Sequence, residues 1–308
     1  MSIEKTVLRT VETSVEAEGI LSEKNLERAF DTNGKEIIRG SLTLKIDDTR
    51  FIRFNVYAGK YTKDGKESAI YPGIETVMNE YHSIAEVGEE NATKVRVSRG
   101  RLEPQSYLSR RNGQIVTGVR YSSNFFNRSG QNYEPKAEFK IEGFVSAVAP
   151  EIGKEGEETG RLKVTLLVPT YAGIEPFTMI VPEELSDSFM SYYDVGLTGT
   201  FYGDIINQTI VSEKVVKMAI GKDIHKESSQ TIIEHVMSGA EEPYEEDDPK
   251  TFSTDIIRQA LTERELRLEE MKQKAANQTT TAANPAANQS TTGRQIPKFS
   301  SAFSGTGF

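Results

Sequence analysis

The stretch GKEIIRGSLTLKIDDTRFIRFNVYAGKYTKDGKES, residues 34–68, decides the fold class that the sequence predicts. Apolar and polar residues alternate along it, which is typical of strands with one buried face. Within residues 51–57 the odd positions hold Phe, Arg, Asn and Tyr, and the even positions hold Ile, Phe and Val. One face is therefore expected to carry a cation and aromatic rings, and the opposite face to pack on a core. Residues 63–65 (KDG) are a good hairpin turn.

The same alternation continues along the chain. Further strands are expected at 93–97, 114–122, 136–148, 161–182 and 194–207. Apolar residues at three-to-four spacing predict helices at 73–87 and 183–193. Five or so strands, with a helix between the third and fourth, match a five-stranded Greek-key barrel. We therefore predict a mainly β protein made of two small OB-like β-barrel units with one helix in each, followed by an acidic, largely disordered C-terminal tail.

Charge is unevenly distributed, and this suggests the domain boundaries. The chain has a formal net charge of −9, yet residues 35–140 hold 18 Lys/Arg against 13 Asp/Glu, and residues 141–225 hold 6 against 13. The predicted organisation is an N-terminal arm or short helix (1–34), a basic OB-like domain (35–135), an acidic OB-like domain (136–225) and a tail (226–308). Within the tail, residues 251–276 are expected to form a helix N-capped near Ser253 or Thr254, and the low-complexity stretch after it to be disordered.

The basic domain contains the candidate binding residues. Residues 94–140 alone carry ten Lys/Arg against three acids, interleaved with Tyr and Phe. Cations meet phosphates and flat rings stack on unpaired bases, so this mixture favours single-stranded nucleic acid. The predicted site comprises Arg39, Arg50, Arg53, Tyr57, Lys60, Tyr61, Arg96, Arg99, Arg101, Tyr107, Arg110, Arg111, Arg120, Tyr121 and Arg128. Residues 109–113 are expected to form a hairpin tip. The alternative is a strand-rich domain whose rings are core and whose arginines are solvated.

Signatures of catalysis are scarce. The chain has no cysteine, which excludes disulfides, thiolate catalysis and Cys-based zinc sites. Its three histidines are dispersed, with His225 and His235 expected to be exposed, and its glycine stretches lack phosphate-loop or dinucleotide spacing. We therefore expect a non-enzymatic protein without metal or cofactor. No run of eighteen apolar residues and no apolar signal core are present, so the expected location is the cytoplasm.

The C-terminal region holds a second group of candidate contacts, directed at proteins. An acidic run at 241–249 contains Glu245, Glu246, Asp247 and Asp248, and the last residues contain Phe299, Phe303 and Phe308. Phenylalanines at the end of a low-complexity stretch are typical of a short docking motif. The acidic run is also a candidate to occupy the basic groove in the free protein and to be displaced by DNA.

This layout resembles the single-stranded DNA-binding proteins of phages and other mobile elements, and residues 53–88, RFNVYAGKYTKDGKESAIYPGIETVMNEYHSIAEVG, look like sequence common in phages of Gram-positive hosts. The resemblance covers residues 35–225 at the level of layout, without a diagnostic motif. It implies a location in the host cytoplasm and a tail that recruits replication or recombination proteins. In that family the tail ends in acids beside a terminal aromatic, whereas here the acidic run is internal and the chain ends FSGTGF.

The function predicted from the sequence is sequence-independent binding and protection of single-stranded DNA during replication or recombination. The alternative is a phage structural or assembly protein that self-associates through its β domains, with its tyrosines as interface anchors. A third possibility is an accessory subunit of a replication complex. A homo-oligomer is compatible with each of them.

Overall fold

The computed structural model describes residues 8–109, 112–130, 132–153, 156–216 and 224–282; for 208–216, 224–231 and 276–282 it describes the backbone alone. Strands account for 52% of the chain, so the expected mainly β class is confirmed. The strands join into one continuous sheet of eleven strands. Among the described residues, no helix is both long and apolar enough to cross a membrane.

Five strands near the N-terminus form a closed ring of hydrogen-bonded pairings, which we name the first circuit. Its strands are β1 (Thr13–Phe30), β2 (Glu36–Lys45), β3 (Phe51–Gly59), β4 (Lys94–Leu108) and β5 (Ile115–Ser122). β1 pairs antiparallel with β2, β2 antiparallel with β3, β3 parallel with β5, β5 antiparallel with β4, and β4 antiparallel with β1. The short strand β6 (Phe126–Arg128) adds to the edge of β4. Helices α1 (Tyr71–Glu80) and α2 (Ile84–Val87) and the 3-10 turn Glu89–Asn91 lie between β3 and β4.

A second circuit repeats the same order of pairings. Its strands are β7 (Lys136–Ile152), β8 (Glu158–Thr170), β9 (Gly173–Val181), β10 (Thr198–Val216) and β11 (Ile224–Ala240), with α3 (Glu183–Tyr192) between β9 and β10. β7 pairs with β8, β8 with β9, β9 in parallel with β11, β11 with β10, and β10 with β7. The first part of β1 pairs antiparallel with β7, from Thr13 opposite Ile141 to Glu18 opposite Lys136, and this pairing joins the circuits.

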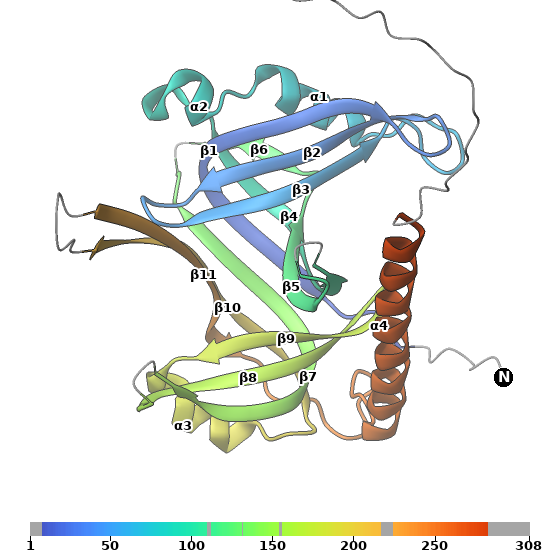
Figure 1. Ribbon diagram of the computed structural model, residues 1–308, viewed down its shortest axis with the longest axis vertical. Coiled ribbons are helices and arrows are strands. Elements are labelled where there is room, and N and C mark those ends of the chain that lie inside the picture. The colour runs from blue at the N-terminus through green and yellow to red at the C-terminus, as the bar shows by residue number, and fades with distance from the viewer. Residues whose placement is uncertain (1–7, 110–111, 131, 154–155, 217–223, 283–308) are drawn as a thin grey trace, which may run out of the picture.

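Figure 1 shows how these parts are arranged in space. The first circuit lies at the top of the view with α1 and α2 on its outer side, and the second lies below with α3 on its outer side. The strands β10 and β11 extend to the left, and the long helix α4 (Thr254–Ala282) stands on the right, beside the second circuit and the β4–β5 hairpin. The β4–β5 hairpin descends between the circuits, toward β9 and α4.

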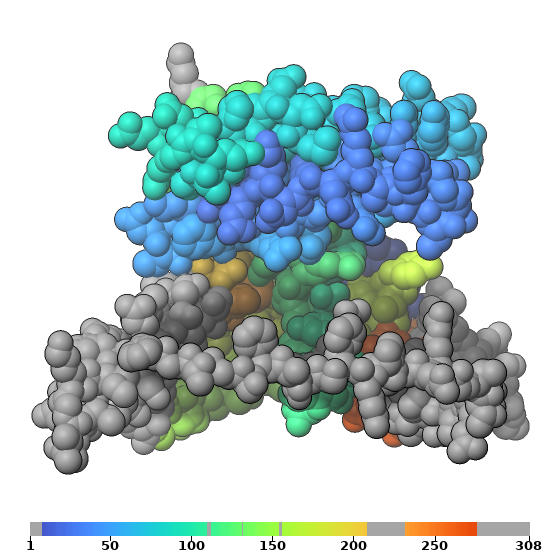
Figure 2. Space-filling model, turned by 45° about the horizontal axis from the view of Figure 1, so that its top comes forward, coloured from blue at the N-terminus to red at the C-terminus, as the bar shows by residue number. Residues whose placement is uncertain are grey.

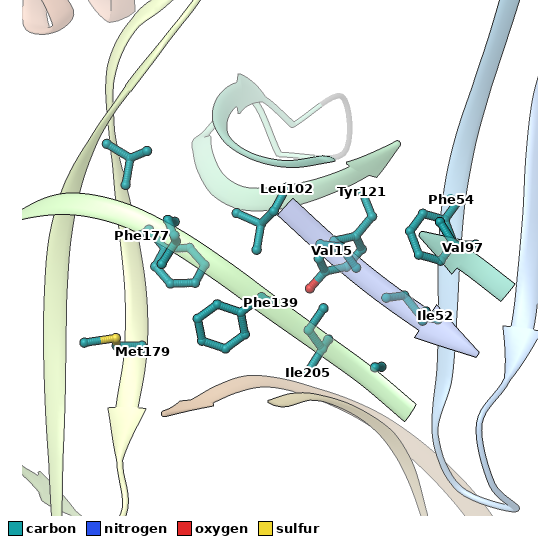
Figure 3. Close-up of a cluster of buried hydrophobic side chains, with 14 of the residues drawn as sticks. Val15, Ile52, Phe54, Val97, Leu102, Tyr121, Phe139, Phe177, Met179 and Ile205 are labelled. Atoms are coloured by element: carbon teal, nitrogen blue, oxygen red, sulfur yellow. The ribbon is translucent and has the colours of Figure 1, made fainter. Parts of the chain in front are cut away.

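The two circuits share one hydrophobic core. Figure 3 shows Tyr121 of β5 and Val15 of β1 directed toward Phe139 and Phe177 of the second circuit. His235 of β11 is 5% exposed, and its Nε2 is 2.8 Å from the Tyr121 hydroxyl. Burial lowers the pKa of His235 to about 4 and raises the pKa of the Tyr121 phenol. The expectation that His235 is exposed is wrong, because it belongs to the inward face of a strand.

The N-terminal region differs from the expected arm or short helix. Residues 13–30 form the strand β1, whose inward positions Val15, Ala17 and Leu21 are buried. Two of the inward positions, 17 and 19, are Ala and Gly, so the apolar alternation is weak although the strand is central. The helix expected at 73–87 is also interrupted. Ser83 is the N-cap of α2 and forms a capping box with Glu86, so residues 81–83 separate two short helices.

The predicted tail does not begin at residue 226. Residues up to 240 complete β11, and the start of the C-terminal helix packs on the core through Phe252 of the preceding linker and through Ile257 and Ala260 of α4. The helix expected at 251–276 is confirmed: α4 begins at Thr254, and the Ser253 hydroxyl accepts a hydrogen bond from the Ile256 amide (3.3 Å). Those three apolar side chains attach the C-terminal helix to the folded body.

A buried carboxylate joins α4 to both circuits. Glu175 of β9 is 2% exposed and accepts hydrogen bonds from Arg264 (3.1 Å) and Arg267 of α4. Ser106 of β4 donates to the same carboxylate at 2.7 Å and receives a hydrogen bond from Arg264 at 2.8 Å. A carboxylate taken out of water needs such partners, so Glu175 fixes where the helix docks.

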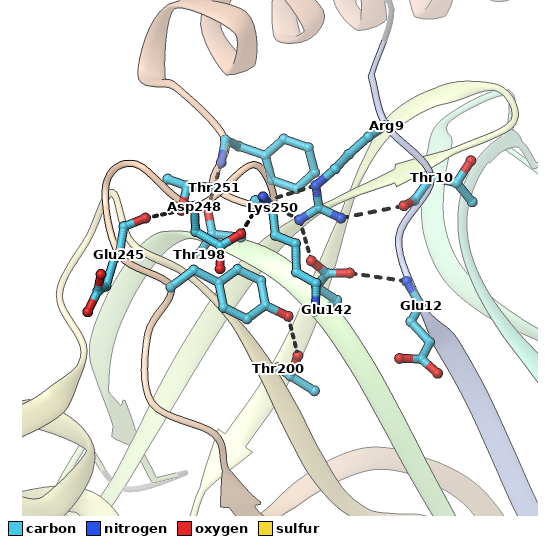
Figure 4. A network of polar contacts seen from close by, with 12 residues as sticks. Arg9, Thr10, Glu12, Glu142, Thr198, Thr200, Glu245, Asp248, Lys250 and Thr251 are labelled. Atoms are coloured by element: carbon cyan, nitrogen blue, oxygen red, sulfur yellow. Dashed lines mark hydrogen bonds and ion pairs between the residues drawn. The ribbon is translucent and has the colours of Figure 1, made fainter.

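Arg9 makes a second junction, between the N-terminal segment and the linker before α4 (Figure 4). Its guanidinium pairs with Glu142, which is 4% exposed, and donates to the carbonyl of Lys250 (2.9 Å). The same group lies over the Phe252 ring, 4.3 Å from its centre. The N-terminal segment and the linker before α4 are thereby both held near Glu142 of β7.

Candidate nucleic-acid interface

An open groove of about 740 Å³ crosses the outer face of the first circuit. We name it the arginine groove. It is lined by Gly40 of β2, Asn55, Val56 and Tyr57 of β3, Arg99, Arg101 and Glu103 of β4, Arg120 and Ser122 of β5, and Ser123, Asn124 and Phe125 beyond β5. Four circuit strands contribute to it, so its shape depends on their pairing rather than on one loop.

Strand alternation places the β3 side chains in the groove. Positions 52, 54, 56 and 58 are buried and positions 53, 55 and 57 are exposed, so the two-faced strand expected from the sequence is confirmed. Tyr57 is 57% exposed. In the register of the sheet, Arg39 of β2 lies opposite Tyr57, and both Asn55 and Arg101 lie opposite Ser122. Cations and a ring thus occupy neighbouring positions on adjacent strands.

The backbone of Tyr57 is held by a side chain from the segment after β5. Asn124 accepts from the Tyr57 amide at 3.2 Å and donates to the Tyr57 carbonyl at 2.9 Å. Ser123 continues the parallel pairing through its amide, which donates to Asn55 O (3.1 Å), and its hydroxyl donates to Arg99 O (3.2 Å). The parallel pairing of β3 with β5 covers only two residue pairs, and these hydrogen bonds extend it by one more residue. They thereby fix the backbone that forms the floor of the groove.

Phe125 and Arg99 form the other aromatic element of the groove. Phe125 is 38% exposed, and the Arg99 guanidinium lies 5.2 Å from its ring centre. The Phe125 amide donates to the Ser123 hydroxyl at 3.0 Å, which orients the segment. A guanidinium over a ring keeps its charge available while its planar group is oriented.

The groove is positively charged. Arg99, Arg101 and Arg120 line it together with a single acid, Glu103. Glu103 pairs with both Arg101 (3.6 Å) and Arg120. Arg99 forms no ion pair with any described residue, and neither does Arg53, which continues the exposed face of β3. Arg39 pairs with Glu27 at 2.8 Å where both side chains are more than half exposed, so solvent screens that pair.

The structure brings only part of the predicted site together. Tyr57, Arg99, Arg101 and Arg120 line the groove, and Arg39 and Arg53 flank it. The other described members lie outside the groove lining. Arg50 and Lys60 form ion pairs with Asp47 and Glu36, and Arg128 lies over the Tyr81 ring. Tyr61 is in the turn after β3, Arg96 is at the start of β4, and Tyr107 is in the β4–β5 hairpin.

Tyr121 is a correction to the predicted site. It is 6% exposed, and its ring lies in the core close to Phe54 and His235. Position 121 of β5 is an inward position, with Arg120 and Ser122 outward, so Tyr121 is not available to a ligand. The β4–β5 hairpin closes at Ser109, whose amide donates to the Gln114 carbonyl (2.8 Å) and whose carbonyl accepts from the Gly113 amide (2.8 Å). Arg110 and Arg111 lie outside the described residues.

The predicted site lacks two side chains that shape the groove, Asn124 and Phe125. The signal for Phe125 was its place in SNFFNR, where two adjacent rings cannot both face inward in a strand; Phe126 is buried and Phe125 exposed. Asn124 has no recognisable sequence signal, because its role depends on β3, which is distant in the chain.

The acidic run packs on the second circuit, away from the arginine groove. The Tyr244 and Glu241 amides donate to Thr198 O (2.9 Å) and Thr200 O (3.0 Å) of β10, and the Tyr244 hydroxyl bonds to that of Thr200 (2.7 Å). The idea that this run occupies the groove in the free protein is therefore wrong. Glu245, Glu246 and Asp247 are exposed and Asp248 is half-buried. The predicted contacts Phe299, Phe303 and Phe308 lie outside the described residues.

Within the described part of the chain, no three His, Asp or Glu side chains are grouped to hold a metal ion.

The YorF family model matches residues 12–274. The chain therefore belongs to the YorF family, and the match covers both circuits and most of α4.

The solved structures that resemble the chain include two of one protein. The wild-type single-stranded DNA-binding protein from Thermus aquaticus matches with 12% identity over 77% of this chain and 95% of that chain, at a TM-score of 0.47. A deletion mutant of that protein matches with 12% identity over 78% and 98% of the respective chains, at a TM-score of 0.46. Likeness at this level carries no conclusion about the ligand of the present chain. No curated protein is significantly similar.

Proposed function

We propose that this protein binds single-stranded DNA without sequence preference, through the arginine groove and without catalysis. The observation that carries the proposal is that Arg99, Arg101 and Arg120 share one open groove with two exposed rings, Tyr57 and Phe125. Guanidinium groups would contact successive phosphates while the rings stack on bases. Stacking on a ring requires an unpaired base, so the groove favours a single strand over duplex.

We infer that each circuit is an OB-type barrel. Both have the pairing order first–second–third–fifth–fourth–first, a parallel pair between the third and fifth strands, and a helix between the third and fourth. An OB barrel binds oligonucleotides on the face formed by its second and third strands. In the first circuit these are β2 and β3, which present Arg39, Arg53 and Tyr57.

The role that fits such binding is protection of exposed strands during replication or recombination, in the cytoplasm of the cell or of a phage host. Contacts with other proteins of those processes are assigned to the exposed acids Glu245, Glu246 and Asp247, with Asp248 beside them, and to the phenylalanines at 299, 303 and 308. Because the acidic run is anchored on β10, its substitution should alter a protein contact and leave DNA affinity unchanged.

The test is fluorescence anisotropy of a labelled oligo-dT of about 30 nucleotides, long enough to span more than one OB unit, at two salt concentrations with unlabelled duplex as competitor. We expect tight binding that duplex does not remove and a log–log salt slope near −0.7 for each phosphate neutralised. The variant Arg99→Ala should reduce the slope by about one phosphate. Arg258→Ala, an exposed arginine on α4, is the matched control.

Absence of binding at low salt would refute the proposal. Self-association through the β domains would then become the leading function, and sedimentation of the same preparation would measure it directly.

A further inference from the structure

A second cleft, of about 680 Å³, adjoins the arginine groove. We name it the tyrosine cleft. It is lined by residues 8–13 of the N-terminal segment and β1, residues 101–104 of β4, and residues 168–171 and 173 at the β8–β9 turn. Arg101 and Glu103 line both cavities, so the two lie next to each other at β4. Figure 2 shows the surface hollowed beneath the blue strands of the first circuit, where parts of the second come into view.

The far wall of the tyrosine cleft is an exposed tyrosine on an anchored turn. Tyr171 has a relative exposure of 103%, so its ring is fully open to solvent. The turn beneath it is fixed, because Thr170 Oγ1 donates to Gly173 O (2.9 Å) and Arg267 of α4 donates to the Ala172 carbonyl. A large ring fully in water on a fixed backbone is a surface suited to stacking, since little backbone freedom is lost when a ligand binds.

The charges facing the tyrosine cleft are balanced. Its acids are Glu12, which pairs with Lys140 at 2.7 Å, and Glu103, which pairs with Arg101 and Arg120. Its remaining cation, Arg9, is engaged by the buried Glu142. The other lining residues include the buried apolar groups of positions 11, 102, 104 and 168. The cleft is therefore suited to bases rather than to phosphates, in contrast to the arginine groove.

We propose that the tyrosine cleft is a second subsite for the same single strand, in which Tyr171 stacks on a base that lies beyond Arg101. This inference rests on the proposed function. A strand leaving the arginine groove would pass Arg101, which contacts its backbone at the junction, and would then run between β4 and the β8–β9 turn. The second circuit would thereby take part in binding although its region of the chain is acidic.

The experiment compares two labelled oligo-dT probes with the full-length protein, one of about 8 nucleotides, which fills a single site, and one of about 30. We expect Tyr171→Ala to weaken binding of the long probe by about fivefold or more, the equivalent of one lost stack, and to leave the short probe and the salt slope unchanged. Tyr171→Phe keeps the ring and should keep wild-type affinity. Tyr192→Ala, which removes another exposed tyrosine of the second circuit, should change neither probe.

Wild-type affinity of Tyr171→Ala for both probes would overturn the inference and leave the proposed function standing. Equal weakening for both probes would also overturn it, because Tyr171 would then affect binding in the arginine groove rather than in a second subsite. A wild-type protein that binds neither probe refutes the proposed function and this inference together.

Discussion

Tyr57 and Tyr61 lie four residues apart and are both exposed, yet only Tyr57 lines the arginine groove. We expect Tyr57→Ala to weaken oligo-dT binding by about 1–3 kcal/mol, the contribution of one stacked base. Tyr61→Ala should bind as wild type, because its ring stands on the turn after β3. Anisotropy titrations of the two variants provide the measurement, and equal losses would show that the groove is not the binding surface.

Substitution of Asn124 tests whether the position of the Tyr57 backbone affects binding in the groove. Asn124→Ala removes both hydrogen bonds to the Tyr57 backbone, at a cost to folding stability of about 1 kcal/mol for each. Because Tyr57 is then less fixed, oligo-dT affinity should fall with the ring still present. Denaturant unfolding and anisotropy on one preparation measure the two effects. Unchanged stability together with unchanged affinity would contradict the role given to Asn124.

Whether a predicted residue lines the groove depends on which face of its strand the side chain occupies. Alternation in β3 is regular, so the outward position of Tyr57 followed from sequence. Tyr121 has a cation within three residues, as Tyr57 does, but the β5 sequence Ile115–Ser122 alternates too weakly to assign its faces. Its inward position follows from the pairing of β5 with β3, which no local pattern reports.

At the level of the elements, the packing of α4 on the sheet depends on the buried carboxylate of Glu175. Glu175→Ala would leave Arg264 and Arg267 without their carboxylate in a site where Arg264 is 15% exposed. We expect a loss of roughly 3 kcal/mol in the free energy of unfolding, because the remaining charges are uncompensated. Asp255→Ala removes an exposed acid from the same helix and should cost less than about 1 kcal/mol. Urea unfolding of both variants decides the matter; equal midpoints would refute the assigned role.

Elements with strong apolar alternation were predictable, and elements with small or charged inward residues were not. β3 presents a large apolar residue at nearly every inward position. β1 instead buries Ala17, Gly19 and even Glu18, which is 4% exposed, so its segment is typical of a polar arm by composition. Its central place results from pairing with β2, β4 and β7, which are distant in sequence.

For the whole molecule, His235 links stability to pH. In the folded state its pKa is about 4, because burial disfavours the charged imidazole, whereas the unfolded chain takes up the proton near pH 6.5. Between these values the unfolded state binds more protons, so stability falls as pH decreases from 6.5 toward 4 and this contribution levels off below 4. At pH 5 the loss should be roughly 2 kcal/mol.

Thermal unfolding at pH 7 and pH 5 measures this dependence, with His235→Gln as the comparison. The variant has no titrating group at this position and should show a smaller difference between the two pH values. An equal difference in wild type and variant would place the dependence elsewhere in the molecule.

At the scale of the whole chain, the sequence indicated two β units but not their union. Charge separates residues 35–140 from 141–225, whereas the core joins Tyr121 and His235 across that boundary. Charged residues lie mostly on the surface, so their distribution along the chain does not show which buried residues share a core. A truncation at 225 would accordingly remove nearly all of β11, and both β9 and β10 would lose the strand that joins them.

The pairing of β1 with β7 also has a consequence during synthesis. The first circuit is complete once the chain has been made to the end of β5 at Ser122, while the outer edge of Thr13–Glu18 still awaits β7. The second circuit cannot close until the ribosome has passed Ala240. Once β7 has been made it covers that edge of β1, but β7 then awaits β10 and β9 awaits β11. From Ser122 to Ala240, more than a hundred residues of translation, the nascent chain therefore presents one unpaired strand edge or another, which is the kind of surface that invites pairing with another chain.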